Sequence, residues 1–466
     1  MKSQRILLML LLVMFASACN SARDSEQPNL IIILTDDQGY ADVGFNGCQD
    51  IPTPNMDRIA GNGVLFTDGY VTYPVCGPSR AGLITGRYQD RFGFGRNPLF
   101  APNDSLMGLS LSEETIADFL GREGYVTKAI GKWHLGAYED LRPLQRGFDE
   151  FYGFLSGGHR YFPEEWTLED ISQVKSQFEA YKTKLLDDDR RIDENEYITD
   201  ALSREAVSFV ERHPASPFFL YLAYNAPHSP LQATDKYLER FDHITDPKRK
   251  TYAAMVSAVD DGIGLLLDKL EEQGELKNTM IFFLSDNGGP INVNGSRNTP
   301  LRDGKSSLYE GGVRVPFAMM WQAAIREPVI FSQPVSSLDI AATFAARAGA
   351  KPANKLDGTD LVPFITGEKE GSPHEALFWR KFDSGDYAVR NGKFKLVNYR
   401  DSQDALFDLE KDIEESRNID ELEVTEALLE QKEAWESEMM DPVFLGLMQG
   451  KQYDRLHPDR YDVAPY

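Results

Sequence analysis

Four apolar segments along the chain are each followed at once by polar side chains. The segments are residues 30–34, 125–130, 218–222 and 280–284. The polar residues that follow them are Asp36, Asp37, Lys132, His134, His228, Asp286 and Asn287. Apolar runs of this length are typical of strands buried on both faces, as in a parallel sheet. Because ligands collect beyond the carboxyl ends of such strands, we expect these polar residues to converge on one cleft.

Helical patterns fall between the predicted strands. Thr53 and Pro54 suit the N-cap and first position of a helix that Gly61 closes. A second helix is predicted from the region of residue 112 to Gly124, and a third has an apolar stripe over residues 256–270. Strands that alternate with helices indicate an α/β fold, with a large, mostly parallel sheet sandwiched between helices.

The pattern becomes shorter and more polar after about residue 370. Segments that resemble strands of an antiparallel sheet cover residues 376–379, 387–390, 394–397 and 405–408. They predict a smaller C-terminal domain over residues 370–466, which also contains a helix over residues 424–439. The larger domain then spans residues 28–369. Within it, residues 160–200 are acidic and weakly periodic, and we expect them to form a surface insertion.

The N-terminus has the features of an export signal. Lys2 and Arg5 precede an apolar run over residues 6–15, which is too short to span a bilayer and ends in small residues before Cys19. These features predict a signal peptide over residues 1–18 and a tether over residues 19–27. The cleavage region resembles a bacterial lipoprotein box, in which Cys19 is lipidated. An ordinary cleaved signal with an incidental Cys19 is the alternative.

A lipidated Cys19 places the protein in the bacterial cell envelope, anchored through its lipid to a membrane, in the periplasm or at the outer membrane. No later segment is long and apolar enough to span a bilayer. If Cys19 is lipidated, Cys48 and Cys76 form the only disulfide pair that the sequence allows. An unpaired cysteine in an envelope protein is either buried and inert, or it takes part in a reaction or carries a modification.

The charge of the chain restricts its partners. The formal net charge is −24, from 73 acidic and 49 basic residues, so the surface repels polyanions and nucleic acid binding is disfavoured. An anionic substrate must therefore meet a local concentration of basic residues.

The predicted cleft contains candidates for cation binding. Asp36 with Asp37, and Asp286 with Asn287, supply hard oxygen ligands that suit calcium or magnesium. For either pair alone, a solvated turn or a helix cap is the alternative. Two such pairs at equivalent strand ends favour a bound cation, because adjacent carboxylates without one repel each other.

Basic and nucleophilic residues complete the set of candidates. Arg80, Lys132, His134, His228 and Lys305 lie in loops rich in Gly or Pro, where anion-binding sites are built, although each alone is more typical of a protein surface. Cys76 stands two residues before Pro78, which suits the first turn of a helix, so the thiol would lie at a helix N-terminus. From the residues alone, Cys76 is a nucleophile or a metal ligand.

A longer motif around Cys76 resembles a known signature. Cys76, Pro78, Ser79 and Arg80, followed by Leu83, Thr85, Gly86 and Arg87, are similar to the signature of the formylglycine sulfatases, which belong to the alkaline-phosphatase-like superfamily. Further motifs of that family follow in order over most of residues 28–316. The resemblance implies that Cys76 is oxidised to formylglycine by a formylglycine-generating enzyme or an anaerobic sulfatase-maturing enzyme.

The resemblance also implies a role for each candidate. Asp36, Asp37, Asp286, Asn287 and the modified Cys76 would bind one Ca²⁺, with Mg²⁺ or Mn²⁺ as alternatives. Arg80, Lys132 and Lys305 would hold the sulfate. His228 would protonate the leaving oxygen after a hydroxyl of the hydrated aldehyde attacks sulfur, and His134 would remove a proton from the second hydroxyl. The implied activity is the hydrolysis of sulfate esters.

The substrate is also suggested by resemblance. Residues 151–162 and 227–232 are similar to stretches of envelope sulfatases from polysaccharide-degrading bacteria, which implies a sulfated poly- or oligosaccharide, such as the galactan carrageenan. His159 and Arg160 would line the sugar subsite, with exposed loop positions as the alternative. Two other functions compete with this one: a phosphate or phosphonate ester hydrolase of the same superfamily, and a lipoprotein that binds sulfated glycans without cleaving them.

Overall fold

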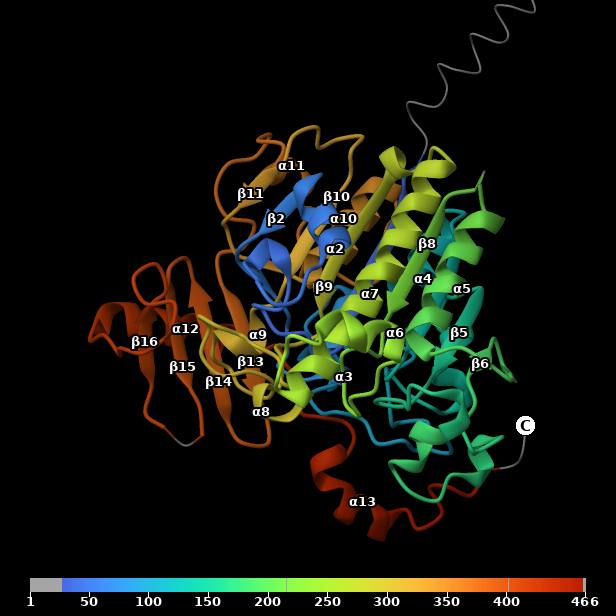
Figure 1. Cartoon of the computed structure of the whole chain (residues 1–466). Helices are drawn as coiled ribbons and strands as arrows, with labels where there is room; N and C mark the ends of the chain where they lie inside the picture. Colours follow the sequence, from blue (N-terminus) through green and yellow to red (C-terminus); the bar gives the residue numbers. More distant parts are fainter. Residues whose placement is uncertain (1–26, 215, 401, 464–466) are drawn as a thin grey trace, which may run out of the picture.

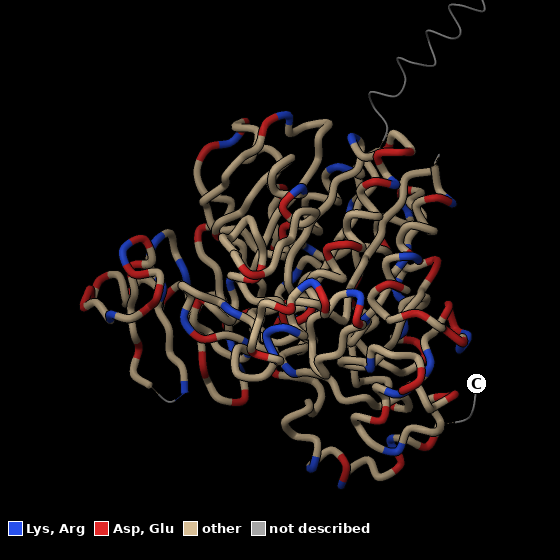
Figure 2. The backbone as a smooth tube through the Cα atoms, viewed as in Figure 1, with Lys and Arg blue, Asp and Glu red and all other residues tan. Residues whose placement is uncertain are grey.

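The computed structural model describes residues 27–214, 216–400 and 402–463. The predicted signal peptide, the lipidation site Cys19 and all but the last residue of the tether lie outside these residues and stay predictions. Within the described residues, no helix has both the length and the apolar character needed to cross a membrane. Figure 2 shows Asp and Glu positions spread along the described backbone and not gathered in one region.

A ten-stranded sheet forms the centre of the molecule, in the order β11-β2-β10-β9-β1-β8-β4-β5-β6-β7 (Figure 1). In chain order, these strands are β1 (Asn29–Thr35), β2 (Val64–Phe66), β4 (Val126–Lys132), β5 (Glu150–Phe154), β6 (Leu186–Asp187), β7 (Arg190–Arg191), β8 (Phe218–Ala223), β9 (Thr279–Ser285), β10 (Phe317–Met320) and β11 (Val329–Phe331). The run from β9 to β5 is parallel, whereas β10 and β6 pair antiparallel at its two sides. The four predicted strands are β1, β4, β8 and β9, which are neighbours at the centre of the sheet.

Helices cover both faces of this sheet. One face packs against α2 (Pro54–Gly61), α5 (Ile198–Arg212) and α7 (Pro247–Glu272), and the other against α3 (Cys76–Thr85), α4 (Ile116–Arg122) and α10 (Leu338–Ala348). Alternate residues of β1 divide between the two cores, with Ile31 and Ile33 on the first face and Leu30, Ile32 and Leu34 on the second. This division explains why the strand is apolar throughout. The predicted sandwich of a mostly parallel sheet between helices is confirmed.

Two helix boundaries differ from the predicted ones. α4 begins at Ile116 and not near residue 112, because Thr115 and Asp118 form a capping box that sets the start. α7 begins at Pro247, well before the predicted apolar stripe, because Asp246 caps its first turn. The capping residues decide both boundaries.

The C-terminal part forms a separate antiparallel sheet, at the left of Figure 1. It consists of β13 (Leu377–Lys381), β14 (Asp386–Asn391), β15 (Phe394–Asn398) and β16 (Ala405–Asp408), and α12 (Leu422–Glu436) packs against it. These elements confirm the predicted small sheet and helix. Short elements complete the fold: β3 (Gly69–Tyr70), α6 (Asp235–Leu238), α8 (Ile291–Asn294), α9 (Glu310–Val313), β12 (Val335–Ser336), α11 (Val362–Ile365) and α13 (Gly450–Leu456).

Residues 160–200 are less superficial than expected. They contribute β6 and β7 to one edge of the main sheet and bury Tyr161, Trp166 and Leu185 in its core. The expectation of a surface insertion is therefore wrong for this part of the segment, because its few apolar residues are the ones that anchor it.

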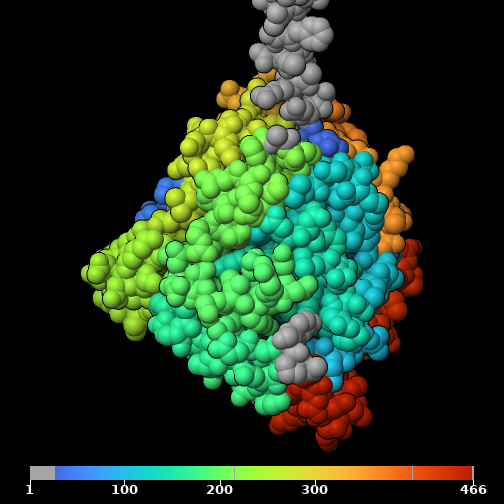
Figure 3. Space-filling view, turned by 90° about the vertical axis from the view of Figure 1, so that its right-hand side faces the viewer, coloured from blue at the N-terminus to red at the C-terminus, as the bar shows by residue number. Residues whose placement is uncertain are grey.

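The C-terminal tail leaves the small sheet and returns to the main domain. In Figure 3 the tail, drawn in red, forms the lower end of the molecule beneath residues drawn in green and blue. The Leu447 N–H donates to the Asn97 carbonyl at 2.9 Å, and the Tyr453 hydroxyl donates to Asp104 at 2.6 Å. Tyr453 and Phe444 are buried in the main core. The tail is therefore an integral part of the larger body.

A buried cluster of charges joins the small sheet to the main domain. Lys395 of β15 lies 2.7 Å from the Glu310 carboxylate and 3.0 Å from that of Glu415, and all three side chains are fully buried. Burial acts to raise the pKa of Glu310, but Lys395 and Arg314 outweigh it and hold this pKa below the usual range. Glu310 therefore stays ionised and depends on the lysine.

We expect Lys395→Met to lower the free energy of unfolding by roughly 3–5 kcal/mol, because two buried carboxylates would lose their common cation. The matched control is Lys393→Met, since Lys393 is more exposed and pairs with Asp408 at 3.3 Å. That change should stay within about 1 kcal/mol of the wild type. Urea unfolding measures both, and equal midpoints for the two variants would contradict the role given to Lys395.

Candidate active site

The register of the central strands brings the acidic residues together. Thr35 at the end of β1 pairs with Ser285 at the end of β9, so Asp36 and Asp286 leave the sheet side by side. The Asp286 N–H donates to the Thr35 carbonyl at 3.0 Å, and the Asp37 N–H donates to the Asp286 carboxylate at 3.2 Å. The predicted convergence at one edge of the sheet is thus present for both pairs.

These acids form a cluster with Cys76 that suits a divalent cation. One ligand atom from each of Asp36, Asp37, Asp286 and Cys76 lies within 4.8 Å of the others, and all four residues are buried. The Asn287 side-chain oxygen is buried without a hydrogen-bond partner among the described residues. Because three buried carboxylates and an unpaired amide oxygen are hard ligands, the residues present fit Ca²⁺ or a similar ion. Their burial rules out the solvated turns considered as the alternative.

The backbone at Asp37 supports this arrangement. Asp37 has a φ of 67°, a left-handed conformation that is unfavourable for a residue with a Cβ atom. Asn287 donates its amide N–H to the Asp37 carboxylate at 2.7 Å, and Lys305 donates to the same oxygen at 2.6 Å. These contacts hold the Asp37 carboxylate toward the cluster.

Cys76 begins helix α3, as predicted, and lies between the acids and a lysine. Its Sγ atom is 3.5 Å from the Asp36 carboxylate and 3.2 Å from Lys305 Nζ. Burial and the nearby Asp286 carboxylate raise the pKa of the Cys76 thiol to about 12, although Lys132 and Lys305 oppose the shift. The unmodified side chain therefore keeps its proton. Cys48 and Cys76 are both free, so the disulfide pair that the sequence allows is not formed.

Each acid of the cluster has a basic partner. Lys132 Nζ lies 2.5 Å from Asp36, and Lys305 Nζ lies 2.6 Å from Asp37. Arg80 contacts Asp286 through Nε at 2.9 Å and through a terminal nitrogen at 2.8 Å. Charge-assisted pairs of this kind fix the positions of both partners. The basic residues therefore surround the place where the thiol meets the acids, which is where an anionic group would bind.

The two candidate histidines reach the same place from different loops. His228 Nε2 lies 3.7 Å from Asp37, and its Nδ1 lies 2.6 Å from the Ser229 carbonyl. His134 has a left-handed backbone, with a φ of 57°, and its buried Nδ1 has no hydrogen-bond partner among the described residues. Burial lowers the pKa of both rings, and the positive charge of Lys132 adds to this shift. Both imidazoles are therefore neutral at pH 7.

A cavity of about 550 Å³ opens onto Cys76, His134, His228 and Lys305. Its outer wall comes from segments that the sequence did not connect with the site. They supply Arg96, Asn97, Gln177, Phe178, Tyr181, Lys381, Asp383, Leu447, Met448 and Gln449. Lys381 and Asp383 lie at or just after the end of β13 in the small sheet, and the others follow no predicted strand. None of them belongs to a motif, so no pattern in the sequence connected them with the site.

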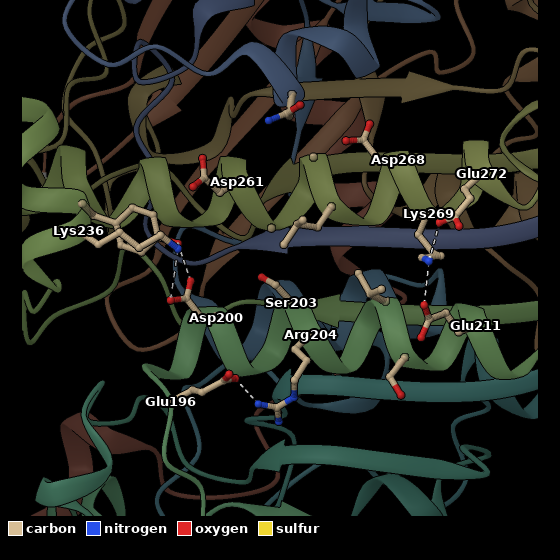
Figure 4. A pocket seen from close by; sticks show the side chains of 17 residues that line it. Glu196, Asp200, Ser203, Arg204, Glu211, Lys236, Asp261, Asp268, Lys269 and Glu272 are labelled. Carbon is tan, nitrogen blue, oxygen red and sulfur yellow. Dashed lines mark hydrogen bonds and ion pairs between the residues drawn. The ribbon is translucent and has the colours of Figure 1, made fainter.

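A wider hollow of about 850 Å³ lies between α5 and α7, away from these residues (Figure 4). Its lysines and Arg204 are paired with acids of the same hollow, as the dashed lines in Figure 4 show, and Asp261 and Asp268 pair with arginines outside it. Lys269 lies 2.8 Å from Glu211, and Lys236 lies 3.8 Å from Asp200. Because these charges compensate each other at the surface, the hollow lacks the convergent, unpaired groups of the cavity at Cys76.

His159 does not lie where the sequence placed it. The ring is fully buried, with its two nitrogens 2.9 Å from the Arg160 carbonyl and 2.8 Å from the Thr183 carbonyl. Both the exposed position and the sugar contact expected for His159 are wrong, because neither nitrogen is left to bind a ligand. Arg160 is partly exposed and lies 3.8 Å from Glu165, and its contact with a sugar stays a prediction.

Comparison with known proteins identifies the family. A family model described as "Sulfatase" matches residues 28–350, which is most of the chain. The chain belongs to the sulfatase family. A second model, described as "N-sulphoglucosamine sulphohydrolase, C-terminal", matches residues 303–439, which include the small sheet. The enzyme is therefore a sulfuric ester hydrolase, and the resemblance seen in the sequence is confirmed.

Individual relatives agree with this assignment. The sulfatase is 35% identical over 373 residues to N-acetylgalactosamine-6-sulfatase of Mus musculus, an alignment that covers 76% of this chain and 69% of the relative. It is 39% identical to Ps i-CgsB, whose crystal structure in complex with k-i-k-neocarrahexaose matches with a TM-score of 0.85 over 94% of this chain and all of that one. The phosphonate monoester hydrolase of Agrobacterium radiobacter shares the fold alone, at 21% identity and a TM-score of 0.62.

We expect removal of divalent cations to lower the melting temperature of the sulfatase, and Ca²⁺ to restore it. An ion at 100 times its Kd stabilises the folded state by about 2.7 kcal/mol. Asn287→Ala should lose most of the Ca²⁺-dependent shift, because its buried side-chain oxygen has no hydrogen-bond partner among the described residues and its amide contacts Asp37 of the cluster. Asn292→Ala, at an exposed position, is the matched control. Thermal unfolding with chelator and with added Ca²⁺ checks this, and an unchanged melting temperature would refute the site.

Proposed function

We propose that the sulfatase hydrolyses sulfate esters on a carbohydrate, through a formylglycine made from Cys76 and one bound Ca²⁺. The observation that carries the proposal is the position of Cys76. Its Sγ lies at the N-terminus of α3, 3.5 Å from Asp36 and 3.2 Å from Lys305. A side chain at position 76 therefore lies next to both the proposed cation ligands and the basic groups.

The proposed nucleophile and ion supply the chemistry that the other side chains support. A formylglycine hydrate offers one hydroxyl to attack sulfur and a second whose deprotonation expels the sulfate. A bound Ca²⁺ offsets negative charge on the sulfuryl oxygens. Asp36, Asp37, Asp286 and Asn287 would bind this ion through their oxygens.

The basic residues have separate tasks in this proposal. Lys305, at 3.2 Å from Sγ, is placed to donate a hydrogen bond to a sulfate oxygen, and Lys132 contributes positive charge from the other side through its contact with Asp36. Arg80 is fully buried and also donates to the Lys132 carbonyl at 3.1 Å. It therefore orients Asp286 and Lys132 while its charge supports the anion.

The histidines transfer protons in this proposal. His228 turns Nε2 toward the cluster, because Nδ1 donates to the Ser229 carbonyl. Burial lowers the pKa of His228 to about 3, although Asp37 opposes the shift, so the ring must gain a proton before it acts as an acid. An anionic sulfate ester beside the ring favours that protonation. His134 has a free Nδ1 and serves as the base for the second hydroxyl.

A sulfated galactan such as carrageenan is the substrate class that we propose. The similarity to Ps i-CgsB, solved with a neocarrahexaose, supports this choice at 39% identity over nearly the whole chain. The cavity volume of about 550 Å³ also exceeds what one small sulfate ester requires. The N-acetylgalactosamine-6-sulfatase relatives support a sulfated carbohydrate more generally.

The same proposal includes the route by which the enzyme matures. A signal peptide over residues 1–18 and lipidation of Cys19 would place it in the bacterial cell envelope, anchored to a membrane. A formylglycine-generating or anaerobic sulfatase-maturing enzyme would act on Cys76 while the chain is unfolded. The burial of Cys76 in the folded protein supports that order of events.

The two competing functions have weaker support. A phosphate or phosphonate ester hydrolase shares the fold, but the family model and the relatives above 30% identity are sulfatases. A glycan-binding protein without turnover would not need the complete set of acids, bases and cysteine that the site contains.

Residue 76 provides the direct test. We expect mass spectrometry of the peptide that carries it to detect an aldehyde, and Cys76→Ala to abolish hydrolysis of sulfate esters. Cys48→Ala is the matched control and should keep full activity. Assays with sulfate and phosphate monoesters of one alcohol should favour the sulfate. Substantial activity in Cys76→Ala would overturn the assignment, and an unmodified thiol in protein from the native host would favour binding without turnover.

The leaving-group role of His228 has a separate test. We expect His228→Ala to lower kcat on a sugar sulfate by roughly 10²- to 10⁴-fold, the usual contribution of general acid–base catalysis. The loss should be much smaller for an aryl sulfate with an acidic phenol, which leaves without a proton. His243→Ala, at an exposed position, is the control. Equal losses on both substrates would contradict the role.

A further inference from the structure

The mouth of the catalytic cavity carries exposed apolar side chains from two distant segments. Phe178 is 64% exposed and Met448 is 90% exposed, yet both line the same cavity as Cys76. Leu447, beside Met448, is 40% exposed. Large apolar side chains that gather at the entrance of a polar site are typical of a binding surface.

The Met448 side of the entrance is tied to the nucleophile by hydrogen bonds. The Leu447 N–H donates to the Asn97 carbonyl at 2.9 Å, and the Asn97 side-chain oxygen accepts from the Gly77 N–H at 2.8 Å. Gly77 follows Cys76 directly. Arg96 donates to the Phe444 carbonyl at 2.8 Å and holds the same tail. Met448 therefore stands at a defined place relative to position 76, although its side chain is exposed.

The Phe178 side is held by its own neighbours. Its ring packs edge-on against Tyr181, with 5.7 Å between ring centroids, and Tyr181 also lines the cavity. Gln177 accepts a hydrogen bond from the Phe100 N–H at 2.9 Å. Phe178 is thus an exposed ring whose position is held by Tyr181 and by the hydrogen bond of its neighbour Gln177.

The other charged residues that line the outer part of the cavity are compensated by neighbouring charges. Asp383 accepts from Arg96 Nε at 2.9 Å and from Gln449 at 2.9 Å, and Lys381 lies 3.1 Å from Asp386. No unpaired cation faces the entrance from these residues. The entrance therefore suits an apolar ring face flanked by hydroxyl groups, and a second sulfate group would gain little there.

We infer that Phe178 and Met448 form a clamp for the sugar that adjoins the sulfated one, and that this clamp makes the enzyme prefer a saccharide chain to a single sugar sulfate. A sugar ring has an apolar C–H face, which packs on aromatic and aliphatic side chains, and an edge of hydroxyls, which Gln177 and Gln449 can meet. The inference rests on the proposed function, because it requires a carbohydrate sulfate at position 76.

The test compares a galactose monosulfate, which has no neighbouring sugar, with a sulfated neocarrahexaose as substrates of the mature enzyme. For Phe178→Ala and Met448→Ala, kcat/KM on the hexasaccharide should fall roughly 5- to 30-fold, in line with the partial burial of one large apolar side chain against a sugar ring. The fall should come from a higher KM, with kcat nearly unchanged. On the galactose monosulfate both variants should match the wild type. Ile330→Ala, which removes a 73% exposed apolar side chain from edge strand β11, is the matched control.

Each outcome decides between defined alternatives. Variants that keep the wild-type values on both substrates, or lose equally on both, would overturn the clamp and leave the sulfatase function intact. A wild type that cleaves aryl sulfates but neither the galactose monosulfate nor the neocarrahexaose would overturn the clamp together with the galactan substrate. Absence of the aldehyde at position 76 and of all sulfatase activity would instead refute the proposed function itself.

Discussion

The burial of like charges at the end of the central sheet is the constraint on which the site depends. Asp36, Asp37 and Asp286 emerge together because β1 and β9 are parallel and in register. Such acids are tolerated in the interior only when cations compensate them. Lys132, Lys305 and Arg80 provide that compensation and thereby become fixed themselves. The same contacts that make the acids stable therefore assemble the basic groups that an anionic substrate needs.

The small C-terminal sheet supports this arrangement from outside. Glu310, which follows the Lys305 loop, depends on Lys395 of β15 at 2.7 Å, and the Tyr399 hydroxyl donates to the Ser306 carbonyl at 3.1 Å. The loop that carries Lys305 is thus held between the two sheets. Beyond the sheet, the tail reaches the rim of the catalytic cavity and supplies Leu447, Met448 and Gln449. The C-terminal part consequently affects both the position of a basic group and the shape of the entrance.

Several elements could be predicted because their signals are local. The four central strands are apolar throughout, since both of their faces are covered, and α3 begins at Cys76, as the position of Pro78 indicates. The strands β2, β10 and β11 on one side of the sheet were not predicted, because they are short. The residues of the proposed cation site were identified for the same local reason, since they follow directly on strands and match family motifs.

By itself, the sequence determined the fold class, the sulfatase family and the residues that meet around Cys76, because strand periodicity and motif spacing are properties of neighbouring residues. Only the tertiary structure decided what surrounds them. His159 lies in a loop that appeared open to solvent, yet contact with the Thr183 carbonyl buries it. Met448 belongs to no motif, and its place at the cavity that contains Cys76 follows from the hydrogen bond between Leu447 and Asn97. Such contacts join segments far apart in the chain, and their geometry depends on packing that no local pattern contains.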